Sequence, residues 1–277
     1  MTFVARFANG QGHDWGFVEG NKVYSVGEKA TLIEAISDQG LLKELSTVRD
    51  NAFDVDSVRL LAPVADPPQF VGVGLNYRDH AAESGMDIPD EPITFGLLRN
   101  SIVGDGDVIR IPSFTDQVDW EAELGIVIGR GGCDIAQEDA LSHVAGYTIV
   151  NDVSARDIQM SEGQWGRSKS FDSFKPMGPW ISTTDELGDA SDLVVSLWVN
   201  GELKQSSNTS QLIFSVPRLV SLLSRSTTLY PGAVIATGTP HGVGFTRTPP
   251  EFLEDGDVVT IEIEGIGRLT NSVEIAE

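Results

Sequence analysis

The segment VDWEAELGIVIG, residues 118–129, alternates two carboxylates with apolar side chains. Successive side chains of an extended chain point to opposite faces, so Glu121 and Glu123 share one face. The opposite face is apolar and carries Trp120, Ala122, Leu124, Ile126 and Ile128. The segment therefore predicts a strand with a core-facing row on one side and a matched pair of acids on the other.

Spacing alone does not assign chemistry to this pair of acids. The segment TIEIEG, residues 260–265, places Glu262 and Glu264 at the same spacing, with no chemically suggestive residues around them. Alternation of this kind is typical of any half-exposed strand. Other residues must therefore single out the pair at 121 and 123.

Composition limits the class of protein. The chain has 277 residues, 40% of them hydrophobic, which is enough for a substantial core in one large domain or in a small and a larger one. The net charge of −22 argues against partners such as nucleic acid or an anionic membrane surface, since both require Lys and Arg. The single cysteine, Cys133, excludes an internal disulfide framework.

No targeting segment is visible in the sequence. The first ten residues, MTFVARFANG, lack the charged start and apolar run of a secretory signal. No apolar run approaches the ~20 residues that span a bilayer. We therefore expect a cytoplasmic protein with no membrane partner.

The first 60 residues have the pattern of a small domain. Residues 17–26, FVEGNKVYSV, predict two strands around a turn at Gly20-Asn21, and residues 31–40 predict a short helix with Gly40 just beyond its end. Three prolines follow in APVADPPQF, residues 62–70. We predict a small N-terminal α/β domain over residues 1–60 and a larger domain over residues 61–277.

The larger domain is mostly short strands. We expect strands within residues 69–74, 106–112, 121–129, 145–154, 193–203, 233–238 and 257–265. Helices are expected over residues 76–84, 153–159 and 214–226. The pattern favours a β-rich α+β fold with mixed or antiparallel sheets.

The segment GVGLNYRDHAAESG, residues 72–85, holds a candidate catalytic pair. A nucleotide-binding loop is excluded by spacing, because Tyr77 stands where a third glycine is needed. With Asn76 as the helix N-cap, His80 and Glu83 share one helical face. The carboxylate can orient the imidazole and raise its basicity, which suits a general base. An ordinary surface ion pair is the alternative.

Three later segments carry further polar side chains. In TIVNDVSARDIQ, residues 148–159, an acid followed by a cation and an amide fits either a cap with a salt bridge or a metal ligand with substrate contacts. The loop GQWGRSKSFDSFKPMGPW, residues 163–180, includes Gln164 and Lys169, and its varied side chains fit either function or packing. Gly238-Thr239-Pro240 after an apolar strand can be an anion-binding nest or a tight turn.

In this order along residues 60–277, these motifs resemble the fumarylacetoacetate hydrolase family. The resemblance implies a mixed β-sandwich roll as the catalytic domain, a smaller N-terminal domain, a homodimer and a divalent metal, Mg²⁺ or Mn²⁺. The residues that carry it are His80 and Glu83, Glu121 and Glu123, Asp152, Arg156 and Gln159, Lys169, and Gly238-Thr239-Pro240.

The resemblance also implies a role for each matched position. Glu121, Glu123 and Asp152 would be the metal ligands, and a set made only of carboxylates suits a hard cation. His80 and Glu83 would form a catalytic dyad on a mobile segment that closes over the site. The positions of Arg156, Gln159, Lys169 (also catalytic) and Thr239 would hold the keto-acid end of a small anionic 2-oxo acid. Gln164 and Tyr77 are two further candidate substrate-binding residues.

The implied reaction is metal-dependent hydrolysis of a C–C bond in an acylpyruvate-like 2,4-dioxo acid, giving pyruvate and a second acid, with His80 and Glu83 activating water. The alternatives are an oxaloacetate decarboxylase, an isomerase or hydratase of a 2-hydroxy-dienoate, and a non-catalytic scaffold. One position departs from the family, because Leu97 stands where a lysine is frequent. Substrate recognition near residues 95–100 is therefore expected to differ.

Overall fold

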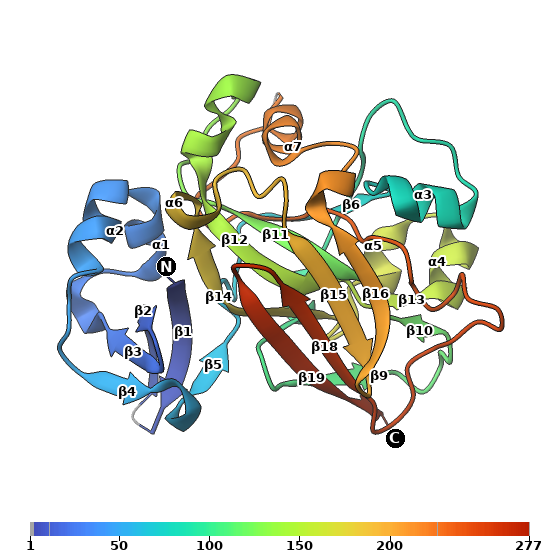
Figure 1. Cartoon of the computed structure of the whole chain (residues 1–277), viewed down its shortest axis with the longest axis horizontal. Helices are drawn as coiled ribbons and strands as arrows, with labels where there is room; N and C mark the ends of the chain where they lie inside the picture. The colour runs from blue at the N-terminus through green and yellow to red at the C-terminus, as the bar shows by residue number, and fades with distance from the viewer. Residues whose placement is uncertain (1–2, 11, 226, 277) are drawn as a thin grey trace.

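A computed structural model describes residues 3–10, 12–225 and 227–276 (Figure 1). Its N-terminal part is a small antiparallel sheet with two short helices beside it. The hairpin around Gly20-Asn21 is confirmed by the pairing of β2 with β3. The elements of this part are β1 (Phe3–Asn9), β2 (Gly12–Glu19), β3 (Lys22–Ser25), η1 (Gly27–Lys29), α1 (Leu32–Ser37), α2 (Gln39–Leu45), β4 (Ala52–Asp54), η2 (Val55–Ser57) and β5 (Arg59–Leu61).

The prediction that Gly40 lies just beyond the first helix is wrong. Helix α1 begins after a capping box made by Thr31 and Glu34, and it ends at Ser37. The carboxylate of Asp38 then accepts the backbone N–H groups of Gly40 and the next residue, which starts α2 at once. A new N-cap at Asp38 therefore places Gly40 in the first turn of a second helix.

The rest of the chain confirms a β-rich α+β fold. Its strands are β6 (Phe70–Gly74), β7 (Ile93–Gly96), β8 (Ile102–Val103), β9 (Val108–Ile111), β10 (Val118–Asp119), β11 (Ala122–Ile128), β12 (Val144–Asn151), β13 (Ser154–Ala155), β14 (Lys175–Thr183), β15 (Val194–Val199), β16 (Glu202–Asn208), β17 (Val234–Ala236), β18 (Val258–Ile263) and β19 (Gly267–Ile275). Its helices are α3 (Arg78–Ser84), η3 (Arg99–Ser101), η4 (Gln137–His143), α4 (Arg156–Glu162), α5 (Trp165–Ser168), α6 (Thr184–Leu187), η5 (Thr209–Gln211) and α7 (Val216–Leu223). The end of the helix expected over residues 214–226 lies outside the described residues.

Two sheets enclose the main core. The larger sheet runs β4-β3-β2-β1-β14-β12-β11-β17-β6-β7, with most neighbours antiparallel and β17 parallel to β6. The smaller sheet runs β16-β15-β18-β19-β9 and lies in front of it in Figure 1. Contacts of β11 with β15 and of β12 with β18 join the two layers. The apolar row predicted from the opening segment lies buried between them: Trp120, Ala122, Leu124, Ile126 and Ile128.

The N-terminal part continues the larger sheet. Strand β1 pairs with β14 through Phe3 opposite Ser182 and Val4 opposite Ile181. Strand β5 in turn pairs with β1. The division into domains at residue 60 stays a prediction, and the sheet itself passes from one part into the other.

All three helices predicted in this part begin later than expected, with α7 starting at Val216, and one predicted strand is a hairpin. Tyr77, not Asn76, precedes α3, because the Asn76 side chain bonds to distant backbone groups instead. Helix α4 begins only at Arg156, since Ser154 and the residue after it pair with β10. The segment 193–203 forms β15 and the start of β16 around a turn at Asn200.

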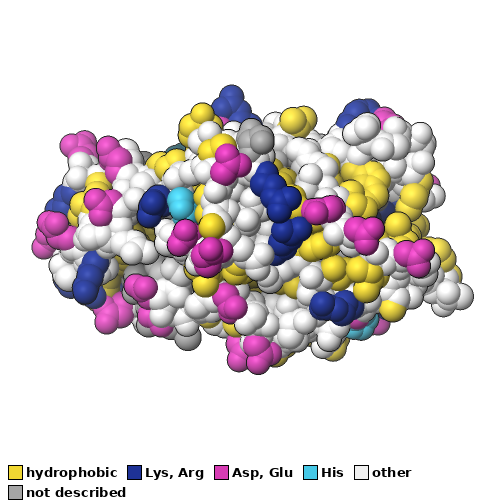
Figure 2. All heavy atoms as spheres, turned by 90° about the horizontal axis from the view of Figure 1, so that it is seen from above, with side chains coloured by type: hydrophobic (Ala, Val, Ile, Leu, Met, Phe, Trp, Pro, Cys, Tyr) yellow, Lys and Arg dark blue, Asp and Glu magenta, His cyan; other side chains and the backbone are white. Residues whose placement is uncertain are grey.

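Acidic and basic side chains are scattered over the face shown in Figure 2, and hydrophobic side chains gather mainly in its right half. No helix within the described ranges is long and apolar enough to cross a membrane.

Candidate metal centre and active site

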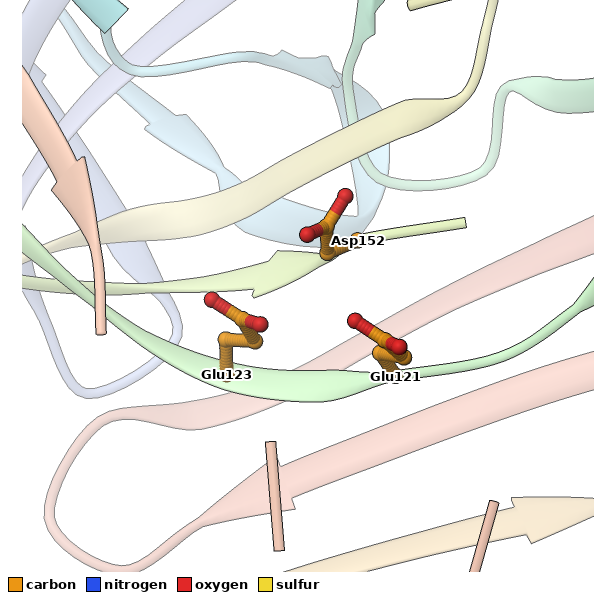
Figure 3. A group of neighbouring side chains, drawn as sticks. All are labelled: Glu121, Glu123 and Asp152. Carbon is orange, nitrogen blue, oxygen red and sulfur yellow. The ribbon is translucent and has the colours of Figure 1, made fainter. Parts of the chain in front are cut away.

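Three carboxylates meet where β11 and β12 lie side by side (Figure 3). Glu121 directly precedes β11, Glu123 lies within it, and Asp152 directly follows β12. The antiparallel pairing is extended by a bond from the Asp152 N–H to the Glu121 carbonyl at 2.9 Å, which brings the two side chains together. One oxygen of each carboxylate lies within 4.8 Å of the others, and the residues are only 5%, 1% and 1% exposed, respectively.

Two cations neutralise part of this cluster. Lys169 Nζ donates to Glu121 Oε2 and Asp152 Oδ2, both at 2.8 Å, and to Ser154 Oγ at 2.7 Å. Arg156 Nη2 lies 2.6 Å from Glu121 Oε1. Burial acts to raise the pKa of Glu121, but Lys169 and Arg156 outweigh it and lower the pKa to about 2.

Glu123 has the opposite environment. Burial, together with the like charges of Asp152 and Glu121, raises its pKa well above the ordinary value. Its Oε2 accepts the Gly238 N–H at 2.8 Å, and among the described residues no cation lies within ion-pair distance of it. An added cation would relieve this repulsion, so the donor set fits a divalent metal with hard oxygen ligands. Mg²⁺ or Mn²⁺ suits that set, and the choice between them stays a prediction.

Arg156 is held by an acid that the sequence analysis missed. Fully buried Asp119 accepts from Arg156 Nε at 2.9 Å and from the backbone N–H groups of Gly244 at 2.7 Å and Phe245 at 3.1 Å. Arg156 Nη1 in turn donates to Gln159 Oε1 at 2.9 Å, as expected for residues on one helical face. Asp119 therefore joins the start of α4 to the loop after β17.

His80 of the proposed dyad lines the same cavity. His80 Nδ1 lies 3.4 Å from Glu83 Oε2 on α3, and the Gly242 N–H donates to both carboxylate oxygens at 3.0 and 3.1 Å. Burial acts to raise the pKa of Glu83, but the bonds from His80 and Gly242 outweigh it, so the pKa lies below its usual value. His80 and the three carboxylates line one cavity of about 80 Å³.

The other predicted substrate residues divide into two groups. Arg156, Gln159, Lys169 and Thr239 line the cavity. Gln164 is exposed, and the structure does not bring it into the cavity lining. Tyr77 is fully buried outside that lining, and burial together with Glu123 raises the pKa of its hydroxyl. The roles of all these residues stay predictions.

Two further residues near the site were also missed. Gln205 accepts the Ala122 N–H at 2.9 Å through Oε1 and donates through Nε2 to Thr239 Oγ1 at 2.9 Å, which joins β11 to the turn at Gly238-Thr239-Pro240. Lys175, at the start of β14, is fully buried with its Nζ 2.7 Å from Asp152 Oδ1. Burial lowers the pKa of Lys175 to about 8. The sequence did contain one indication of a role for Lys175, because it is the only charged residue of β14 and stands at the start of a largely apolar strand.

Leu97, the position that departs from the family, is buried and packs in the cluster with Phe70 and Val127. It does not line the cavity, whose wall nearby is formed by Phe95 and Trp165. These two rings pack edge to face, with centroids 5.7 Å apart. Near residues 95–100, where the sequence predicted altered substrate recognition, the cavity wall is therefore aromatic.

A buried carboxylate triad, two cations and the imidazole of His80 line one small cavity, which makes it the candidate active site. The chain belongs to the fumarylacetoacetate hydrolase superfamily, because the family model "Fumarylacetoacetate (FAA) hydrolase C-terminal" matches residues 69–274. This agrees with the resemblance drawn from the sequence.

Known relatives and solved structures support the same family. The chain is 48% identical over 219 residues to the mitochondrial oxaloacetate tautomerase fahd2 of Xenopus laevis, covering 78% of this chain and 69% of that protein. It resembles the fumarylacetoacetate hydrolase of Exiguobacterium antarcticum with a TM-score of 0.89 and 41% identity, covering 100% of both chains. It also resembles the 5-carboxymethyl-2-hydroxymuconate delta-isomerase of Mycobacterium smegmatis with a TM-score of 0.83 and 38% identity, again covering 100% of both.

Proposed function

We propose that this enzyme interconverts the enol and keto forms of a small 2-oxo acid of the oxaloacetate type, using Mg²⁺ or Mn²⁺. The observation that carries the proposal is that His80 and the three carboxylates face one another across a single cavity of about 80 Å³. Relatives at 47–48% identity that carry the name oxaloacetate tautomerase support the substrate class. This choice differs from the hydrolysis expected from the sequence, which we keep as the second candidate.

The metal would be held by Glu121, Glu123 and Asp152, and when bound it would act as a Lewis acid on the 2-oxo group. Lys169 and Arg156 offset the remaining charge of the carboxylates. Burial acts to lower the pKa of Lys169, but Asp152 and Glu121 outweigh it and raise the pKa, so Lys169 stays charged at neutral pH. A charged lysine here binds and orients an acid rather than exchanging its proton.

His80 is the residue placed to move a proton on the substrate carbon beside the keto group. Its ring is partly buried, and Glu83, held by Gly242, fixes the orientation through Nδ1. The other ring nitrogen, Nε2, is then the one available for proton transfer. A positioned general base of this kind contributes roughly 10²–10⁴-fold to a rate.

Hydrolysis of a C–C bond in an acylpyruvate is the second candidate, favoured by the same dyad. His80 would take a proton from a water that attacks the distal carbonyl, with pyruvate and a second acid as products. Decarboxylation of oxaloacetate needs no attacking water and depends less on His80. The three reactions therefore differ in their products and in their need for the dyad.

One experiment separates them. Oxaloacetate enol, acetylpyruvate and fumarylpyruvate are each followed by enol absorbance and NMR, with Mg²⁺ or Mn²⁺ and again with chelator. Chelator-sensitive loss of the enol without new carbon products supports the tautomerase, pyruvate with a second acid supports the hydrolase, and pyruvate with CO₂ supports the decarboxylase. His80→Ala should remove tautomerase activity, and His13→Ala, at an exposed position, should not. An unchanged rate in metal-loaded His80→Ala would refute the assignment of the base.

The cytoplasmic location and the homodimer belong to the same proposal. Sedimentation of the purified protein tests the dimer directly.

A further inference from the structure

Lys175 is a fully buried cation behind the carboxylate cluster. Its Nζ donates to the carbonyl oxygens of Val153 at 3.0 Å and Phe174 at 2.8 Å, and it lies 2.7 Å from Asp152 Oδ1. The ammonium thus donates to two backbone carbonyls and lies at ion-pair distance from the Asp152 carboxylate. Lys175 is therefore held by the backbone carbonyls of the residue after Asp152 and of the residue before Lys175 itself.

Lys175 and Lys169 hold different oxygens of the same carboxylate. Lys169 reaches Asp152 Oδ2 and lines the cavity, whereas Lys175 reaches Oδ1 and is not part of the described cavity lining. A substrate can therefore contact Lys169 but not Lys175. Each oxygen of Asp152 is thus paired with a different lysine, Oδ1 with Lys175 and Oδ2 with Lys169.

Lys175 also changes the charge of the site. Four buried carboxylates, those of Asp119, Glu121, Glu123 and Asp152, lie together with the cations Arg156, Lys169 and Lys175. With Lys175 the cluster carries one net negative charge, and a divalent metal would turn it positive. Without Lys175 the metal-loaded cluster would be neutral, and an anionic acid would be attracted less.

We propose that Lys175 is a positioning residue that fixes Asp152. Its charge lowers the affinity of the site for the metal and raises the affinity of the metal-loaded site for the anionic substrate. From its position beside the Asp152 carboxylate, Lys175 repels the metal. Once the metal is bound, the same positive charge strengthens the electrostatic attraction of a 2-oxo acid. This inference rests on the proposed metal site and goes beyond it, because it assigns opposite effects on two successive binding steps to one residue. A merely structural role would weaken both steps together.

The test measures two affinities in the purified full-length protein. Mn²⁺ binding is followed by calorimetry and by the electron paramagnetic resonance signal of free Mn²⁺, and oxalate binding to the Mn²⁺-loaded protein serves as the anion probe. Lys175→Gln keeps an N–H donor but removes the charge, and Lys175→Met removes both. Lys204→Met is the matched control, since Lys204 pairs with Glu202 and Glu251 outside the cavity.

For Lys175→Gln we expect Mn²⁺ to bind at least about tenfold more tightly and oxalate at least about tenfold more weakly, because at an effective dielectric of about 20 one unit charge has an effect of that size out to about 12 Å. Lys204→Met should change neither by more than about twofold. If both affinities of a folded Lys175→Gln fall together, or if neither changes, the inference is wrong. If the wild-type protein binds no Mn²⁺, the proposed metal site is wrong, and the inference about Lys175 is wrong with it. This result is distinguishable from failure of the inference alone, in which wild-type protein binds Mn²⁺ normally. Circular dichroism establishes whether each variant is folded. If Lys175→Met does not fold, the affinities of Lys175→Gln alone test the inference.

Discussion

Replacement of Asn76 by alanine should destabilise the protein by about 3 kcal/mol, because the buried side chain makes three hydrogen bonds that are each worth about 1 kcal/mol. Nδ2 donates to the carbonyl oxygens of Phe214 at 3.1 Å and Thr237 at 2.8 Å, and Oδ1 accepts the Phe214 N–H at 2.7 Å. Each partner left without a bond in the interior adds to the cost, so the figure is a lower estimate. The three bonds join the start of α3 to the segments before α7 and after β17.

A loss of about 3 kcal/mol corresponds to a fall in Tm of about 6–12 °C, since each kcal/mol shifts the Tm of a chain of 150–250 residues by about 2–4 °C. Calorimetry or circular dichroism of metal-free protein measures it. Asn208→Ala is the control, because its partly exposed side chain makes one bond, from the Ser210 N–H at 2.8 Å, and should cost about 1 kcal/mol. A fall below about 2 °C for Asn76→Ala would refute the view that these bonds hold α3 in place.

Three further predictions concern charge and backbone at other positions. Gly238 has φ of +97°, and an added Cβ would lie 2.9 Å from that of Asn76, so Gly238→Ala should lower both Tm and Mn²⁺ affinity. Gly163→Ala, with φ of +69° and no atom within 4 Å, should cost only the backbone strain, about 1–2 kcal/mol, and equal losses in the two variants would count against the role of Gly238. Glu123→Gln should raise the Tm of the metal-free protein, because it removes a repelled buried charge, yet abolish the rise in Tm on adding Mn²⁺; a retained rise would mean that Glu123 is not a ligand. Burial, together with the charge of Asp107, raises the pKa of Asp105 in the folded state, so stability falls as pH rises through the window between its unfolded and folded pKa values. Asp105→Asn should therefore raise Tm at pH 7 and have almost no effect at pH values below the unfolded pKa of about 3.9, and a constant gain at every pH would contradict this.

The parts of the site that were predictable lie on single regular elements. Alternation placed Glu121 and Glu123 on one face, and helical spacing placed His80 beside Glu83. Both patterns depend only on backbone geometry, which a few consecutive residues determine. The apolar row facing the smaller sheet was predictable for the same reason.

The parts that escaped prediction depend on contacts between distant segments. Asp119 is bonded to the backbone of Gly244, and Gln205 connects Ala122 to Thr239. Nothing in the local sequence distinguishes such residues from ordinary polar ones. The prediction of Asn76 as the N-cap of α3 was wrong for the same reason. The Asn76 side chain forms hydrogen bonds with distant segments instead of capping the helix.

The size and lining of the cavity support the proposal of proton transfer more than that of hydrolysis. About 80 Å³ is far below the roughly 300–1,000 Å³ of pockets that hold drug-sized ligands, so the enclosed space suits a small acid. Hydrolysis of an acylpyruvate needs room for the acyl group and for a water beside His80, whereas tautomerisation needs only the acid. The outer wall includes the exposed Met86 and Met160, whose flexible side chains can adapt to a larger acid. A larger substrate would therefore require this wall to move, whereas the buried pairs that hold Asp119, Arg156 and Lys169 are fixed by several bonds each and leave the charged end of the site unchanged.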